Sequence, residues 1–150
     1  MKIEGYFDPD FKPPAPFVDA IIVSKEAGIR HKVSFLIDTG ASMTILLDKD
    51  VKDMGLDVGR LTKAEKQVGG IGGSVETYLV EDARVVFESD EGFYEEALLL
   101  YIGVHDLTGA EEETMKRILV IPSLLGREIL SKFDLYCFPR KGKLYLEYSK

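Results

Sequence analysis

The chain is poor in several residue types, and each shortage narrows what it can be. Its 150 residues contain no Trp, no Asn, a single Gln, one Cys and two His. One Cys and two His are too few to supply the ligands of a typical zinc site, and we expect no metal and no cofactor. The lone Cys137 forms no internal disulfide, and its apolar neighbours predict a small buried side chain in a reducing cytoplasm. Depletion of the thermolabile amides predicts a thermophilic source.

Positive charge and long apolar runs are also lacking. The formal net charge is −7 at pH 7, whereas binding to a phosphate backbone needs clustered Lys and Arg. We therefore expect no nucleic-acid partner. No apolar run approaches the length of a membrane span, and the first residues lack the apolar core of a signal peptide, so we expect no membrane association. With 45% hydrophobic and 30% charged residues, the chain fits one globular domain with a real core.

The apolar segments are short and rich in β-branched and aromatic residues, which predicts an all-β domain. The strands are expected at 17–23, 33–37, 44–47, 75–80, 83–87, 97–102 and 118–121, with a C-terminal hairpin around Pro139–Gly142. One short helix is expected at 124–133, and a weaker candidate lies at 48–56. Residues 1–16 are rich in proline and predict an N-terminal arm, so we place the domain at 17–150.

The first candidate site is Asp38-Thr39-Gly40-Ala41, which follows the apolar run Phe35–Ile37 and precedes another apolar run. A carboxylate between two buried strands is costly unless it has a partner or a task. One alternative is an ordinary turn or capping aspartate. The motif occurs once, so a catalytic carboxylate pair would need a second copy of the chain. The similar Asp106-Leu107-Thr108-Gly109-Ala110 precedes an acidic run and predicts a solvated loop.

Two further segments have a distinctive composition. Gly69, Gly70, Ile71, Gly72 and Gly73 precede a strand-like run, and their backbone amides can approach a ligand closely, as in a flap. The alternative is a flexible hairpin turn, while the spacing does not fit a phosphate loop. The second segment is Leu124–Leu130, which on composition alone is a core strand and helix. Its Arg127 follows Gly126 at a predicted helix start, where the dipole disfavours a cation, so we expect a carboxylate or carbonyl partner for Arg127.

Taken in order, the three segments resemble the retroviral-type (retropepsin-like) aspartic proteases, over roughly residues 17–133. The resemblance implies a closed β-barrel with one short C-terminal helix, working as a symmetric homodimer on peptide or unfolded protein. It implies that Asp38 is catalytic, with Thr39 bonding across the dimer axis, Gly40 offering its carbonyl to substrate, and Ala41 completing the motif.

The resemblance assigns the other segments as well. The amide of Ile71 would reach a water on the substrate, with Gly69, Gly70, Gly72 and Gly73 forming the flap around it. Gly126 would pack behind the active-site loop, and Arg127 would brace the dimer. Ser42 stands where many viral members have an acid, so the usual partner of Arg127 is missing.

This resemblance predicts an aspartic endopeptidase in which two Asp38 carboxylates share one proton and activate a water. Two other interpretations remain. One is a catalytically silent, retropepsin-like dimeric domain for peptide binding or assembly. In this interpretation the acidic insertion at 88–117 covers the cleft. The other is a generic β-barrel binding module in which the three motifs coincide by chance.

Overall fold

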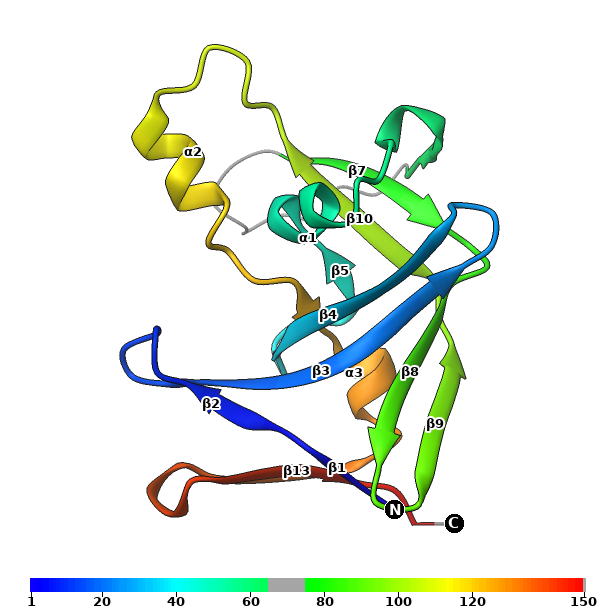
Figure 1. Cartoon of the computed structure of the whole chain (residues 1–150), viewed down its shortest axis with the longest axis vertical. Helices are drawn as coiled ribbons and strands as arrows, with labels where there is room; N and C mark the ends of the chain where they lie inside the picture. Colours follow the sequence, from blue (N-terminus) through cyan, green and yellow to red (C-terminus); the bar gives the residue numbers. More distant parts are fainter. Residues whose placement is uncertain (65–74, 150) are drawn as a thin grey trace.

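The computed structural model describes residues 1–64 and 75–149, and strands dominate this part of the chain (Figure 1). The expectation of a mostly β domain is confirmed. The strands are β1 Lys2–Glu4, β2 Tyr6–Asp8, β3 Ala15–Ser24, β4 Ile29–Ile37, β5 Ile45–Leu46, β6 Thr62–Lys63, β7 Val75–Val80, β8 Arg84–Ser89, β9 Gly92–Ala97, β10 Leu100–His105, β11 Leu124–Leu125, β12 Asp134–Phe138 and β13 Lys143–Glu147.

The long β3–β4 hairpin organises the larger sheet. Its strands alternate buried and less buried residues, as a sheet with one face on the core requires. Gly28, with φ of 66°, forms its turn. The hairpin runs in register from Ser24↔Ile29 to Phe17↔Leu36, so β4 ends one residue before Asp38.

Two very short strands bring distant parts of the chain to the end of β4. The order of the larger sheet is β6-β7-β10-β5-β11-β4-β3-β8-β9, with β2 beside β3. Within it, β11 is parallel to β4, through Leu124↔Leu36 and Leu125↔Ile37, and antiparallel to β5. The chain that leaves β11 therefore emerges beside the chain that leaves β4. The pairings of the described residues record no contact that closes β6 onto β9, and closure of the barrel stays a prediction.

The termini form a separate small sheet of order β1-β13-β12. The predicted C-terminal hairpin is confirmed, with the 3₁₀ turn η2 Pro139–Lys141 and Gly142 at φ 63° joining its strands. Ile3 on β1 is only 1% exposed and belongs to the same core cluster as Leu144 and Leu146. Core packing thus begins well before Phe17, because β1 pairs with β13 and turns Ile3 inward. The division at residue 16 stays a proposal.

The described residues contain three short α-helices: α1 Asp48–Asp53, α2 Glu112–Ile118 and α3 Arg127–Leu130. The first confirms the weaker candidate at 48–56 and the third the C-terminal helix, while α2 was not expected. The predicted 124–133 helix starts later, since Leu124 and Leu125 pair as β11. The predicted strand 118–121 is wrong, because Ile118 ends α2 and residues 119–121 form a turn. Acidic residues in the first turn of α2 and basic residues in its last turn suit the helix dipole, which favours a helix at this acidic run.

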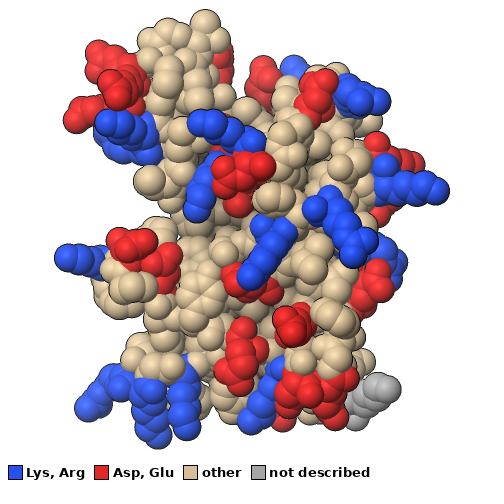
Figure 2. Space-filling view, in the orientation of Figure 1, with Lys and Arg blue, Asp and Glu red and all other residues tan. Residues whose placement is uncertain are grey.

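The surface corrects one further expectation. Cys137 is exposed rather than buried, because β12 is an edge strand with β13 as its one recorded neighbour. Near it, the hairpin between β12 and β13 carries the exposed Arg140, Lys141 and Lys143. Figure 2 shows basic side chains gathered at the lower left, where Figure 1 places the tip of this hairpin. No described helix is long and apolar enough to cross a membrane.

Candidate active site

Asp38 directly follows β4, a strand of the larger sheet. Its backbone N–H donates to the carbonyl of Leu125 at 3.2 Å, which anchors it to β11. Its Oδ1 accepts the N–H of Gly40 at 2.9 Å, and its carbonyl accepts the N–H of Ala41 at 3.1 Å. Asp38 is half-buried, while Thr39 and Gly40 are exposed. The turn therefore fixes Oδ1 of the Asp38 carboxylate, and the two residues that follow Asp38 face solvent.

Residues 38–44, which we call the Asp38 loop, are held from behind by the chain that follows β11. Gly126 lies so close to Met43 that a Cβ built on it would be 2.4 Å from the Met43 carbonyl carbon. Such a contact is far below van der Waals distance, so only glycine fits without a backbone shift. The N–H of Gly126 also donates to Thr44 Oγ1 at 3.0 Å. The structure thus places Gly126 behind the loop, where the resemblance implied it would be.

Arg127 contacts the Asp38 loop twice. Its backbone N–H donates to the carbonyl of Ala41 at 2.8 Å, and its guanidinium Nη1 donates to the carbonyl of Thr39 at 2.9 Å. The expectation of a carboxylate or carbonyl partner is confirmed, and that partner is a carbonyl. A main-chain acceptor explains how Arg127 is placed although residue 42 is a serine. These bonds lie within one chain, so bracing of a dimer by Arg127 stays a prediction.

Sequence reasoning missed Glu128. Its carboxylate accepts both the N–H and the hydroxyl of Thr44, each at 2.5 Å, and its own N–H donates to the carbonyl of Ser42 at 3.3 Å. A usable signal was present: Thr44 opens an otherwise apolar run, and Glu128 follows the Gly126-Arg127 pair directly. A polar residue buried at a strand start needs a partner.

A second polar network lies deeper, where α1 meets β5 and the segment before β11. The Ser123 hydroxyl donates to Asp50 Oδ2 at 2.5 Å and accepts the N–H of Leu47 at 3.0 Å. Burial raises the pKa of Asp50, against the hydrogen bond from Ser123, which lowers it. Asp48 accepts the N–H of His105 at 2.9 Å, and its other oxygen lies 2.6 Å from His105 Nδ1. These buried groups tie α1 to β10 and to the entrance of β11.

The glycine-rich residues Gly69, Gly70, Ile71, Gly72 and Gly73 lie outside the described residues. The chain on either side is described. Strands β6 and β7 pair antiparallel through Thr62↔Leu79 and Lys63↔Tyr78, and the N–H of Ala64 donates to the carbonyl of Thr77 at 2.8 Å. The described chain before residue 65 is therefore paired with the described chain after residue 74, while the assignment of the glycine-rich segment as a flap stays a prediction.

Asp106 does not form a second copy of the motif. It is exposed, its Oδ1 accepts the N–H of Thr108 at 3.0 Å, and this bond lowers its pKa. Gly109 takes φ of 70° in the following turn. The expected solvated loop is confirmed at Asp106. Within the described residues no group of three or more His, Cys, Asp or Glu could hold a metal ion.

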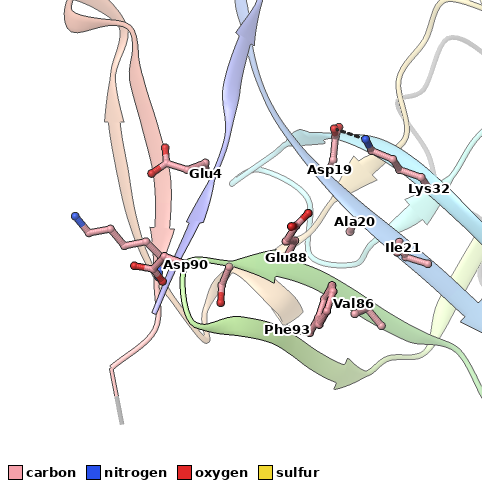
Figure 3. Close-up of a pocket in the computed structure, with 11 residues that line it drawn as sticks. Glu4, Asp19, Ala20, Ile21, Lys32, Val86, Glu88, Asp90 and Phe93 are labelled. Atoms are coloured by element: carbon pink, nitrogen blue, oxygen red, sulfur yellow. Dashed lines mark hydrogen bonds and ion pairs between the residues drawn. The ribbon is translucent and has the colours of Figure 1, made fainter.

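A large hollow of the molecule lies elsewhere. A groove of about 470 Å³ runs between β1, β3 and β8 (Figure 3). Glu88 points into it, the exposed Phe93 borders it, and Asp19 and Lys32 form an ion pair at its rim. None of the residues predicted for the site lines this groove.

Known proteins resemble this arrangement in sequence and in fold. The family model described as aspartyl protease matches residues 24–89, somewhat less than half of the chain, including Asp38. The structure of a retropepsin-like aspartic protease from Rickettsia conorii matches 99% of this chain and 89% of its own, at 17% identity and a TM-score of 0.55. The chain has a retropepsin-like fold. Its motifs, its family match and its fold agree, which confirms the resemblance read from the three sequence segments.

Other comparisons add less. EIAV protease, in a complex with the inhibitor HBY-793, matches 78% of this retropepsin-like chain and 86% of its own, at 20% identity and a TM-score of 0.47. No curated protein sequence matches the chain. The family match ends before residues 126–128, so only the fold comparison spans both halves of the site.

Proposed function

We propose that this retropepsin-like chain is an aspartic endopeptidase that works as a homodimer, with one Asp38 from each subunit. The observation that carries the proposal is the placement of Asp38 after a core strand, on a loop that residues 126–128 hold from behind. The family match and the fold are those of peptidases. The loop motif occurs once in the chain, so a carboxylate pair requires two copies.

The chemistry follows from two carboxylates meeting on a two-fold axis. Both cannot ionise cheaply at short distance, so the pair keeps one proton and titrates as a unit. The ionised Asp38 takes a proton from a water between the two groups, and this water attacks the peptide carbonyl. The protonated Asp38 stabilises the developing oxyanion and later passes its proton to the leaving amine. No residue besides these two needs to change its protonation state.

The remaining predicted roles belong to the same proposal. Thr39 would bond across the axis beneath the pair, and the carbonyl of Gly40, exposed beside Asp38, would accept a hydrogen bond from the substrate backbone. The Gly69–Gly73 segment would close over an extended peptide held as an added strand. Ala41 brings no hydroxyl to the pair, so we expect a rate maximum at mildly acidic to near-neutral pH. A maximum below about pH 3 would contradict this.

Cleavage of a denatured protein tests the proposal directly. We expect the wild type to cleave it, pepstatin to inhibit, and Asp38→Asn to lose activity by a factor of about 10³ or more, since both the acid and the base of the pair change. Asp106→Asn, in the exposed loop, is the matched control and should retain full activity. Cleavage that survives in Asp38→Asn would overturn the mechanism, and no wild-type cleavage would favour the silent peptide-binding domain.

The dimer has its own test. Sedimentation of the active protein should show a species of twice the chain mass, and mixing wild type with excess Asp38→Asn should lower activity because mixed dimers hold one intact carboxylate. A strictly monomeric active species would remove the two-chain site. The cytoplasmic location and the thermophilic source remain proposals from composition, and a melting temperature in the mesophilic range would contradict the second.

A further inference from the structure

Glu128 makes an unusual set of contacts for a carboxylate next to a candidate active site. Its Oε2 accepts the N–H of Thr44 and its Oε1 accepts the Thr44 hydroxyl, both at 2.5 Å. Oε1 also accepts the N–H of Ile129 at 3.2 Å. Thr44 has no exposed surface, and its hydroxyl oxygen in turn accepts the N–H of Gly126. Hydrogen bonds to an ionised acceptor are about twice as strong as neutral ones.

These bonds fix the far end of the Asp38 loop. At its near end, Asp38 is anchored to Leu125; at its far end, Thr44 is anchored to Glu128. Both anchors lie within four residues of each other in the chain, on either side of Gly126. Any shift of Thr44 relative to Leu125 must therefore be absorbed by the residues that follow the Asp38 carboxylate.

We propose that Glu128 is a positioning residue for catalysis: through Thr44 it holds the Asp38 loop so that each Asp38 carboxylate keeps its distance and angle to the partner subunit's. This inference rests on the proposed dimeric protease. Apart from Asp38 itself, Arg127 and Glu128 are the charged side chains of the described residues that form hydrogen bonds with residues 39–44, and the Arg127 guanidinium bonds the carbonyl of the exposed Thr39. The buried end of the loop depends on Glu128.

The proposal has a consequence that a merely structural role lacks. Two carboxylates share a proton more strongly the closer they lie, and strong sharing separates the acid and alkaline limbs of the pH–rate profile. A looser loop lets the two groups move apart, which brings the limbs together. It also lowers kcat more than it raises KM, because the carboxylates act on the transition state rather than on distant parts of the peptide.

Glu128→Gln is the sharpest substitution, because it keeps the size of the side chain. Oε2 faces the N–H of Thr44, and Oε1 faces the N–H of Ile129 as well as the Thr44 hydroxyl. Whichever way the amide turns, its NH₂ group meets a backbone N–H. Thr44→Val is the second variant, since it keeps the shape of Thr44 and removes the hydroxyl. Glu81→Gln, exposed in the turn after β7, is the matched control.

The experiment measures kcat, KM and the pH–rate profile of a peptide substrate, together with folded fraction and dimer mass. For Glu128→Gln and Thr44→Val we expect kcat to fall about 10-fold or more, as for a small misplacement of reacting groups. We expect KM within about twofold and limbs closer by about half a pH unit or more. Glu81→Gln should match wild type.

Each result decides. An unchanged kcat and profile in folded, dimeric Glu128→Gln would overturn the positioning role, and so would activity lost only in proportion to the folded fraction, or variants that do not fold. The proposed function fails separately, through absence of wild-type cleavage or persistence of cleavage in Asp38→Asn. Wild-type cleavage that requires Asp38, combined with an unaltered Glu128→Gln, would leave the protease standing without this inference.

Discussion

The Asp38 loop and the groove of Figure 3 differ in how the residues around them are held in place. The groove is a large hollow of about 470 Å³, yet the ion pair at its rim joins two residues of the single β3–β4 hairpin. In the Asp38 loop, the carbonyls and Thr44 are bonded to residues more than eighty positions later. The groove also has a long-range link, because Lys2 and Asp90 on its lining are 88 positions apart and exchange two backbone-donated hydrogen bonds. The Asp38 loop differs in that several such bonds converge beside one half-buried carboxylate.

The difference has a physical reason. A catalytic carboxylate must be kept within a fraction of an ångström of its productive position, which requires support from elements that are themselves packed. Gly126, Arg127 and Glu128 supply this support from one short stretch. The groove has no such requirement unless it takes part in binding substrate.

Gly126→Ala should have the largest effect on the fold. The new Cβ would meet three backbone atoms of Met43 at 2.4 to 2.8 Å, and backbone cannot swing aside as a side chain can. We expect a loss of about 3 kcal/mol in the free energy of unfolding, the upper range for overpacking, measured by urea titration. Gly59→Ala, whose Cβ meets only the Asp57 carboxylate, is the control. Equal stability of both variants would mean that the Asp38 loop is not tightly backed.

Arg127→Lys should have the next largest effect, on activity more than on stability. A lysine keeps the charge but has one terminal nitrogen on a different stem, so the bond to the carbonyl of Thr39 is lost or displaced. We expect kcat/KM to fall about 10-fold, the equivalent of one hydrogen bond to a charged group. Arg140→Lys, at the exposed hairpin tip, should leave kcat/KM unchanged. Wild-type kinetics in Arg127→Lys would show that the hydrogen bond from Arg127 to the carbonyl of Thr39 does not support the Asp38 loop.

Much of this site could be predicted because its strongest constraints are local in sequence. Asp38 follows an apolar run that becomes β4, and the Gly126-Arg127 pair marks a place where only glycine fits and where a cation needs an acceptor. The β3 and β7 strands follow equally local alternation. Each of these features depends on residues that are neighbours in the sequence, so it can be predicted without knowing which distant segments are in contact.

The parts that sequence reasoning got wrong depend on pairing partners. Leu124 and Leu125 form β11 only because β4 and β5 flank them, and as isolated residues they fit the helix we expected. Ile3 is buried because β13 lies beside it, and Cys137 is exposed because β12 lies at an edge. The Glu128–Thr44 bond joins residues 84 positions apart. A single sequence does not show which distant segments meet.

Asp50→Asn should change the pH dependence of stability, by a smaller amount. Burial raises the pKa of Asp50 above its ordinary value of 3.8, so the folded protein binds this proton more tightly than the unfolded chain. The resulting stabilisation is complete below pH 3.8 and is lost as the pH rises through the raised pKa. The amide cannot ionise, and its carbonyl can still accept the Ser123 hydroxyl.

Relative to wild type, Asp50→Asn should therefore gain unfolding free energy as the pH rises through that window, and the gain should level off above it. Urea titrations at several pH values measure the difference. Asp53→Asn, exposed on the same helix α1, controls for the change in net charge. A difference that is flat with pH would show that Asp50 is as well solvated as a surface carboxylate, and that the support beneath β11 is less closed than the hydrogen bonds indicate.

Phe93→Ser in the groove should have the smallest effect of all. Phe93 is 69% exposed, so its removal costs little buried area, and the groove shares no lining residue with the Asp38 loop. We expect kcat/KM within about twofold of wild type and an unfolding free energy within about 0.5 kcal/mol, as for surface substitutions generally. The measurement is kcat/KM on both a short peptide and a denatured protein. A loss confined to the denatured protein would show that the groove binds parts of the substrate chain beyond the cleaved bond. The Asp38 loop and the groove would then both act on the substrate, the first in catalysis and the second in binding.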